Sequence, residues 1–288
     1  MATLYLVSTP IGNLEDMTLR GLRVLSEVRL IAAEDTRHSR RLLQHYGISR
    51  PLLSLHEHNE QARIDQVLET LDQGHDVALI SDAGTPAISD PGFRLVRACL
   101  RGGHRVVPVP GASALLAALV ASGMPSDRFL FLGFPPRKPA ARKQWLSEVK
   151  EEPGVLIMYE SPRRLPSLLR DIAEVLGPSR PLVVARELTK RYETFWRGSV
   201  RDALTVFAEA PRGEVVVLVG GAPKEAPRDL PSPVREVLHD LMLAGISASQ
   251  AARLVAKLTG LPRRRVYQAA LAEAAGKHAE DKQVEPGT

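Results

Sequence analysis

The chain has 288 residues, of which 44% are hydrophobic and 25% charged, and it carries a net charge of +5 and one cysteine. A single cysteine excludes a disulfide within the chain, and no stretch has the length of a membrane span or the pattern of a signal peptide. We therefore expect a cytoplasmic protein without membrane contact. The mild basic excess suits a polyanionic partner, although a solvated arginine-rich surface is also common.

The first half of the chain alternates apolar runs with helical patterns. The runs predict buried strands at residues 4–7, 30–33, 52–55, 77–80 and 106–109. Between them leucine and valine recur at helical spacing, and most of these stretches end at glycine. This alternation predicts an α/β fold, with a mostly parallel sheet and helices on its faces.

The most informative loop follows the strand at residues 77–80. Two turn clusters, at 81–86 and 89–92, come one after the other. Ligands bind at the carboxyl ends of strands in open α/β sheets, and Gly84 would admit a ligand close to the backbone. Similar loops follow three other predicted strands, at residues 10–13, 34–37 and 110–113. Four such loops at one sheet edge predict a binding site rather than plain connections.

A second α/β unit follows a Pro-rich, basic linker at residues 133–139. Its strands are predicted at 155–158, 182–185 and 215–219, with an antiparallel addition at 194–196, and a further strand at 129–132 precedes the linker. Beyond a second Pro-rich linker every pattern is helical, and two short helices joined by a Gly-Pro turn suggest a helix-turn-helix. The arginine triplet at 263–265 either binds phosphate or is a solvated helix start.

These patterns divide the chain into four predicted parts. We predict an α/β domain at 1–124, a second α/β domain at 125–222, a helical appendage at 228–278 and a disordered tail at 279–288.

Common cofactor and metal motifs are absent from the sequence. It contains no Gly-x-Gly, no Walker A motif, no Gly-x-Ser-x-Gly elbow and no Cys/His cluster. His56 and His58 are two residues apart, but no Cys/His cluster accompanies them, so we expect no metal site.

Six motifs together resemble the tetrapyrrole-methylase superfamily over about residues 3–220. Four lie in the first half: VSTPIGNL at 7–14, AEDTR at 33–37, SDAGTPAISDPG at 81–92 and PVPGAS at 108–113. Two lie in the second half: YESPRR at 159–164 and RELTK at 186–190. Within the superfamily they are most similar to the branch that methylates a ribose of a decoding-centre cytidine in bacterial 16S ribosomal RNA. Gly84-Thr85-Pro86 replaces the Gly-Asp-Pro of the porphyrin-modifying branch.

The resemblance implies two successive α/β domains of the tetrapyrrole-methylase type, not a Rossmann methyltransferase, with the small helical appendage beyond them. It implies S-adenosylmethionine (SAM) as cofactor, a homodimer, and 16S rRNA of the small ribosomal subunit as substrate. The positions that match the family's cofactor site are Pro10, Gly12, Ala83, Gly84, Thr85, Ile88, Ser113, Ala114, Tyr159, Leu188, Gly213 and Glu214.

Methyl transfer to a ribose hydroxyl requires mainly positioning and the removal of one proton. Candidate catalytic residues on the predicted loop ends are Glu34, Asp82, Glu160 and Lys190, beside Asp35 and His56. Each of these side chains has the alternative role of fixing its own loop through a hydrogen bond or ion pair. Arg37, Arg163, Arg164 and Arg186 are candidates for RNA phosphates, or else partners of neighbouring carboxylates. Phe134 and Tyr159 either stack on a base or pack in the core.

Two other functions remain open from the sequence. One is a methyltransferase acting on a tetrapyrrole, which Thr85 disfavours. The other is a ribosome-associated RNA-binding factor that has no catalytic activity.

Overall fold

The computed structural model describes residues 2–56, 59–223, 230–263 and 265–271. His58, Arg264 and the tail predicted at 279–288 lie outside the described residues. The chain divides into two units, Met1–Ala222 and Pro223–Thr288, and each is considered by itself.

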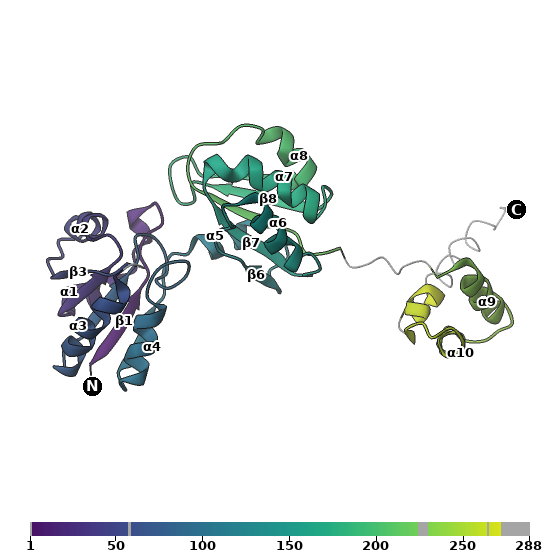
Figure 1. Cartoon of the computed structure of the whole chain (residues 1–288), viewed down its shortest axis with the longest axis horizontal. Helices are drawn as coiled ribbons and strands as arrows, with labels where there is room; N and C mark the ends of the chain where they lie inside the picture. Colours follow the sequence, from purple (N-terminus) through teal and green to yellow (C-terminus); the bar gives the residue numbers. More distant parts are fainter. Residues whose placement is uncertain (1, 57–58, 224–229, 264, 272–288) are drawn as a thin grey trace, which may run out of the picture. The chain divides into compact units, whose positions relative to one another are not determined.

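The first sheet of the larger unit is wholly parallel, with strand order β3-β2-β4-β1-β5. Its strands are β1 (Thr3–Val7), β2 (Leu30–Ala33), β3 (Leu52–Ser54), β4 (Val77–Ile80) and β5 (Arg105–Val109), labelled in part in Figure 1. Its helices are η1 (Leu14–Asp16), α1 (Leu19–Glu27), α2 (Thr36–His45), α3 (Glu60–Asp72) and α4 (Phe93–Arg101). The predicted parallel arrangement is therefore confirmed.

The alternation of side chains along each strand divides the first core into two layers. In β4, Val77 and Leu79 pack with α3 and α4 on one face, while Ala78 and Ile80 pack with α1 and α2 on the other. All four residues are buried, as expected of a central parallel strand. Both faces are covered, so the loops at the carboxyl ends are the part of this sheet left to bind a ligand.

The second sheet is mixed, with strand order β6-β7-β10-β8-β9, and only β6 and β7 pair in parallel. Its strands are β6 (Phe129–Phe131), β7 (Val155–Glu160), β8 (Pro181–Arg186), β9 (Thr194–Ser199) and β10 (Val215–Val219). Its helices are α5 (Ala114–Ser122), α6 (Pro139–Glu148), η2 (Pro162–Arg164), α7 (Leu165–Val175) and α8 (Val200–Val206). The predicted antiparallel addition and the central last strand are confirmed as β9 and β10.

Helix α5 follows the last strand of the first sheet but packs on the second. Its Ala118 and Leu119 are buried in one cluster with Ile157 of β7 and Leu218 of β10, while α6, α7 and α8 cover the opposite face. Arg197 of β9 donates hydrogen bonds to the carbonyls of Ala121 and Ser122 at the end of α5. The domain limits predicted from the sequence stay predictions, and by packing α5 belongs with the second sheet.

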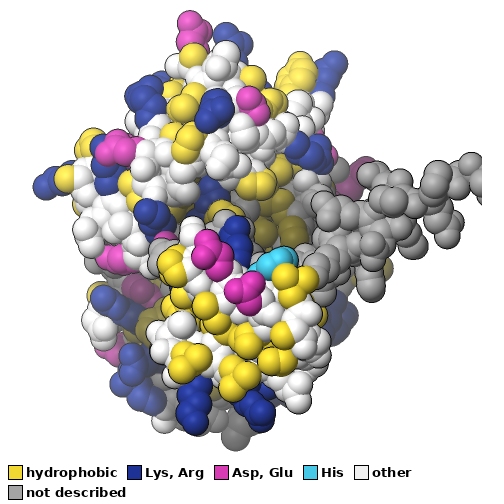
Figure 2. All heavy atoms as spheres, turned by 90° about the vertical axis from the view of Figure 1, so that its right-hand side faces the viewer, with side chains coloured by type: hydrophobic (Ala, Val, Ile, Leu, Met, Phe, Trp, Pro, Cys, Tyr) yellow, Lys and Arg dark blue, Asp and Glu magenta, His cyan; other side chains and the backbone are white. Residues whose placement is uncertain are grey.

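The smaller unit is helical in its described part, as predicted. Helix α9 (Ser232–Leu243) and helix α10 (Ala248–Thr259) bury Leu238 and Val255 against Val266 of the following helical segment. Ser247 caps α10 by accepting the N–H of Gln250, and Gly260, with φ +71°, ends it. Figure 2, which faces this unit, shows hydrophobic side chains over much of its near surface.

Among the helices of the described residues, none is long and apolar enough to cross a membrane.

Candidate functional site

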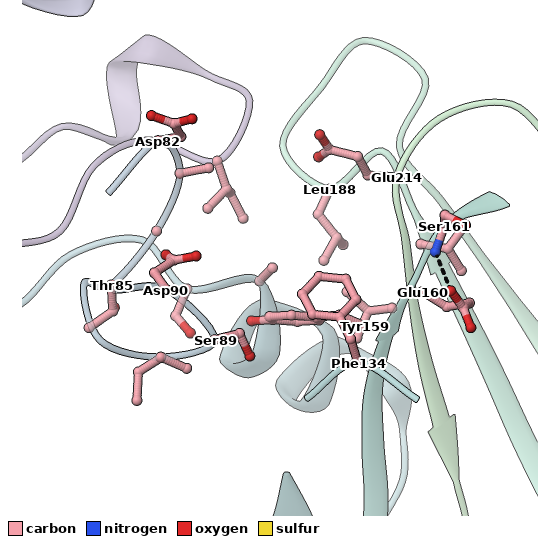
Figure 3. A pocket seen from close by; sticks show the side chains of 18 of the residues that line it. Asp82, Thr85, Ser89, Asp90, Phe134, Tyr159, Glu160, Ser161, Leu188 and Glu214 are labelled. Carbon is pink, nitrogen blue, oxygen red and sulfur yellow. Dashed lines mark hydrogen bonds between the residues drawn. The ribbon is translucent and has the colours of Figure 1, made fainter. Parts of the chain in front are cut away.

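A cavity of about 460 Å³ lies in the larger unit and is lined from both sheets. The first sheet and α5 contribute Ile11, Glu34, Asp82, Ala83, Gly84, Thr85, Ile88, Ser89, Asp90, Ser113 and Ala114. The second sheet contributes Phe134, Tyr159, Glu160, Ser161, Pro162, Leu188, Glu214, Val215 and Val216. Figure 3 shows the two sets facing each other, with Asp82 and Asp90 on one side and Leu188, Tyr159 and Phe134 on the other.

The loop after β4 is held to the loop after β1 by a short antiparallel bridge. The backbones of Thr9 and Gly84 exchange hydrogen bonds of 2.9 and 3.0 Å. Gly84 has φ +83°, and a Cβ there would lie 3.4 Å from Ile11 Cγ2. The Thr85 hydroxyl lies 3.1 Å from that of Ser8 and donates to the Ala112 carbonyl at 3.3 Å. Thr85 therefore ties together three loops at the carboxyl edge of the first sheet.

Backbone strain concentrates in two loops around the cavity. The non-glycine residues with positive φ in the described chain are Ala87, Ser89, Glu187 and Thr189, with φ between 51° and 65°. Such conformations cost free energy and persist where the surrounding contacts impose them, commonly at functional sites.

Tyr159 of β7 connects the two sides of the cavity. Its hydroxyl accepts the N–H of Leu115, in the first turn of α5, at 3.0 Å. Its ring meets those of Phe131 and Phe134 edge to face, with centroids 4.9 and 5.6 Å away. Burial raises the pKa of the Tyr159 hydroxyl, so this group stays protonated. The bond also means that one of the N–H groups at the start of α5 is occupied by protein.

The cavity lining is acidic. Its charged residues are Glu34, Asp82, Asp90, Glu160 and Glu214, and no Lys, Arg or His of the described chain lines it. Burial, followed by the nearby charges of Asp90 and Asp82, raises the pKa of Glu34 to about 6. Burial and the charge of Asp82 raise the pKa of Asp90 to about 6, against the opposing hydrogen bond from Ser81. A lining with this charge favours a cationic ligand over an anionic one.

Glu160 is committed to the protein. Its side chain is fully buried, one oxygen accepts the Ser161 N–H at 2.7 Å, and the other lies 3.2 Å from Arg164 Nη2. Arg164 also donates to the carbonyls of Pro135 and Pro136. Burial raises the pKa of Glu160. Glu160 and Arg164 therefore hold in place the loop that carries Phe134.

Lys190 lies outside the cavity lining. Its ammonium group pairs with Glu214 at 2.9 Å and with Glu187 at 3.2 Å. Burial opposes its charge, but the bonds to Glu214 and Glu187 outweigh that effect and raise its pKa. A Cβ on Gly12 would lie 2.4 Å from Lys190 Cγ, so Gly12 makes room for this side chain. Both residues line a second, more open hollow with Asn13, Leu14, Thr189 and Arg191.

The structure brings most of the predicted site residues to one place. The predicted residues in the lining are Glu34, Asp82, Ala83, Gly84, Thr85, Ile88, Ser113, Ala114, Tyr159, Glu160, Leu188 and Glu214. Pro10, Gly12, Gly213 and Lys190 are not among the lining residues. A Cβ on Gly213 would lie 2.3 Å from the Glu187 side chain, so close packing explains this glycine. The roles assigned to all these residues stay predictions.

The four arginines predicted to bind RNA lie outside the cavity lining. Arg37 pairs with Asp35 at 2.9 Å, Arg186 donates to the Arg212 carbonyl, and Arg164 pairs with Glu160. Arg163 is exposed. Arg37 and Arg164 thus have the carboxylate partners that the sequence left as the alternative, and the role of all four arginines toward RNA stays a prediction.

Several lining residues had no role in the sequence-based prediction. Asp90 and Ser89 belong to the quoted loop at 81–92, and their place beside Gly84 was the available signal. Phe134, by contrast, was a candidate for stacking or core packing, and it lines the cavity after β6, at the carboxyl end of a strand parallel to β7. Ile11 lies in the loop predicted at 10–13, whereas Val215 and Val216 are apolar residues of the kind that fill any core, so no pattern distinguished these two.

Comparison with known proteins gives the same assignment for both units. Residues 3–204 match the tetrapyrrole (corrin/porphyrin) methylases, and residues 229–274 match the RsmI C-terminal HTH domain. The ribosomal RNA small subunit methyltransferase I of Pseudomonas aeruginosa is 52% identical over 93% of this chain and 96% of the relative. The proteins of that name from Escherichia coli O157:H7 and a Synechocystis strain are each 48% identical. The former match covers 93% of this chain and 94% of the relative, the latter 94% and 98%.

Solved structures support the fold. The methyltransferase CobJ aligns with a TM-score of 0.59 at 21% identity, over 77% of this chain and 95% of that one. Cobalt precorrin-4 methyltransferase aligns with a TM-score of 0.58 at 17% identity, over 76% and 94%. At these identities the likeness concerns the fold alone, and it confirms the predicted pair of α/β domains. The chain belongs to the tetrapyrrole (corrin/porphyrin) methylase family.

Proposed function

We propose that the protein transfers a methyl group from SAM to the ribose 2′-hydroxyl of a cytidine in 16S rRNA of the small ribosomal subunit. The observation that carries this proposal is the 52% identity, over 93% of the chain, to a ribosomal RNA small subunit methyltransferase I. That similarity extends past the methylase domains into the helical unit, for which the matching family is named after the same group of proteins.

The residues of the cavity suit SAM, which is a cation at its sulfur and its amino group. The lining has five carboxylates and no basic side chain among the described residues. Gly84 presents bare backbone to the cavity beside Ala83, and both Ala114 and Ser113 are small. On the second-sheet side, Leu188, Tyr159 and Phe134 offer apolar surface for a flat ring. When bound, SAM supplies a methyl group already activated on a positively charged sulfur.

The remaining chemical task is to remove the proton of the ribose hydroxyl. Three of the predicted catalytic residues, Glu34, Asp82 and Glu160, line the cavity. Glu160 is paired with Arg164, and Lys190 lies outside the lining and is paired with Glu214, which leaves Glu34 and Asp82. Asp82 accepts the N–H of Asp35 at 3.0 Å, which fixes its carboxylate. We propose that the neighbouring carboxylates Glu34 and Asp90 act together as the general base that removes this proton. A carboxyl group with a pKa near 6 is a stronger base than usual and is still ionised at neutral pH.

We also propose that two copies associate through the outer face of α5. Helix α5 is apolar on all sides, and its Leu116 and Val120 are 50% and 77% exposed. Phe129 of the edge strand β6, 41% exposed, lies on the same sheet face as α5 because it alternates in register with Phe131. An exposed apolar surface of this kind is typical of subunit contacts. Sedimentation velocity on the wild-type protein and on Leu116→Glu/Val120→Glu tests this proposal. A dimeric wild type and a monomeric variant support it, and a monomeric wild type contradicts it.

A transfer assay tests the main proposal. The protein is incubated with methyl-labelled SAM and small ribosomal subunits that lack the modification, and the RNA is digested to nucleosides. We expect label on the 2′-oxygen of one cytidine. Label on no ribose contradicts the proposal. Turnover of a porphyrinoid in a parallel reaction without RNA transfer would identify a tetrapyrrole methyltransferase, and RNA binding without SAM binding would identify a non-catalytic factor.

We also propose a cytoplasmic location. Fractionation of cells tests it, and we expect the protein in the cytoplasmic fraction.

A further inference from the structure

Helix α4 presents a strongly basic outer face. Arg94, Arg97 and Arg101 recur at i, i+3 and i+7. All three residues are exposed, and α4 contains no acidic residue. In the part of the chain that the structure describes, no carboxylate lies within ion-pair distance of any of the three. This differs from Arg37, Arg142 and Arg164, whose guanidinium groups are paired.

An exposed aromatic ring lies at the first turn of the same face. Phe93 is 63% exposed, and the Arg97 guanidinium lies over its ring, 5.5 Å from the centroid. Arg101 makes a hydrogen bond within α4, in which its Nε donates to the Arg97 carbonyl at 3.3 Å. The guanidinium donors are therefore available to a ligand.

The direction of this face is fixed by the packing of α4. Leu95 and Cys99 on its inner side are fully buried. Glu60 of α3, itself 6% exposed, accepts the N–H groups of Arg94 and Leu95 at 3.1 Å each. This carboxylate at the helix N-terminus secures α4 against α3. The helix that carries the basic face is therefore fixed in position, and its arginines always project from the same side.

The basic face begins at the rim of the cavity. Helix α4 starts directly after the loop that contributes Ile88, Ser89 and Asp90 to the cavity lining. From Arg94 to Arg101 the face extends roughly 10 Å along the helix axis. An RNA strand that places one nucleotide in the cavity would therefore pass over α4 with its neighbouring nucleotides.

We propose that the α4 face, consisting of Phe93, Arg94, Arg97 and Arg101, binds the RNA strand next to the nucleotide that is methylated. The arginines pair with phosphates, for which the guanidinium fork is suited, and Phe93 stacks on a base. This inference rests on the proposed function, since it takes RNA as the substrate. A second copy of the chain is a poorer occupant, because a self-facing contact would bring arginines together without carboxylates to balance them.

The test compares Arg97→Glu/Arg101→Glu with a matched control, Arg170→Glu/Arg201→Glu. The control changes two exposed arginines on α7 and α8, which cover the far face of the second sheet. Affinity for an RNA transcript of the decoding region is measured at fixed salt, SAM affinity by calorimetry and oligomeric state by sedimentation. We expect the α4 variant to bind RNA at least tenfold more weakly with unchanged SAM affinity, and the control to stay within about twofold. Phe93→Ala should lose about fivefold.

Two outcomes overturn the proposal. One is wild-type RNA affinity in the α4 variant with SAM binding intact. The other is an altered oligomeric state with unchanged RNA affinity per protomer, which would make the face a subunit contact. A wild-type protein that binds the transcript through α4 but transfers no methyl group contradicts the proposed function and leaves the RNA surface in place.

Discussion

The cavity and the outer face of α4 are joined by a single loop, at residues 81–92, yet they carry opposite charge. The cavity has five carboxylates and no basic residue among the described lining, and only Glu160 and Glu214 of the five are ion-paired, with residues outside it. The α4 face has three arginines that lack a carboxylate partner in the described chain. Neighbouring groups of opposite sign usually neutralise each other as ion pairs. Keeping them apart suits a protein that holds a cationic methyl donor on one side of a loop and a polyanion on the other.

The largest effect is expected from removing the base on the cavity side. In Glu34→Gln/Asp90→Asn we expect kcat to fall by about 10²–10⁴-fold, because general base catalysis contributes on that order. RNA affinity should stay unchanged, since the α4 face is untouched. In the wild-type protein kcat/KM should rise as the pH increases through about 6, the pKa of both carboxyl groups, and this step should be lost in the variant.

Glu69→Gln on α3 is the matched control for this variant, since it removes a carboxylate outside the cavity lining. Full activity of the double variant, or an equal loss in the control, would show that the raised pKa values have no catalytic meaning.

A smaller but still large effect is expected from adding a side chain at Gly84, in the cavity lining. Gly84→Val places a branched side chain into the cavity lining, and we expect SAM affinity to fall by tenfold or more. Gly74→Val is a close control: Gly74 has φ +84°, against +83° for Gly84, and a Cβ there would meet nothing within 4 Å.

The two glycine variants share the cost of a β-branched residue at positive φ, on the order of 1–3 kcal/mol. Thermal unfolding should therefore show similar destabilisation, and calorimetry should show SAM binding lost in Gly84→Val alone. Equal SAM affinity in both variants would place the SAM site elsewhere.

On the basic side, individual arginines should have a graded effect. For single-stranded RNA, each phosphate contact contributes about 0.7 to the slope of log affinity against log salt. Arg97→Ala and Arg101→Ala should each reduce the magnitude of that slope by about this amount, while Arg170→Ala leaves it unchanged. Titrations at several salt concentrations measure it. Slopes identical to wild type in both α4 variants would mean that these side chains meet no phosphate.

The smallest effect concerns the cost of the acidic lining to stability. In the folded protein the pKa of Asp90 is about 6, above its ordinary value of 3.8, so folding favours the protonated carboxyl group. Its contribution to stability is present below pH 3.8 and is lost as the pH rises through about 6. Asp90→Asn should therefore unfold at a higher temperature than wild type at pH 7, by a few degrees, and the gain should shrink toward pH 4. A gain that does not depend on pH would contradict this origin.

Much of the site was predictable because it follows strand ends. Loops after β1, β2, β4 and β5 were identified by their turn residues, and parallel strands bring their carboxyl ends to one edge. Twelve of the predicted residues line the cavity for this reason. The contribution of Asp90 was not predictable, because an aspartate in a turn has many structural uses, and for Phe134 the sequence left stacking and core packing as alternatives.

By itself, the sequence determined the strands of both sheets, the helices between the first five strands and the loops that carry the ligand site, but not helices α6 and α8. Apolar periodicity and turn residues act locally, so they can be read without knowing the fold. Only the tertiary structure decided that α5 packs on the second sheet and that Glu160 and Lys190 are bound by Arg164, Glu187 and Glu214. The physical reason is that an all-apolar helix has no preferred side, and a loop carboxylate or ammonium has no preferred partner. Both are settled by which surfaces and charges the rest of the chain brings within reach.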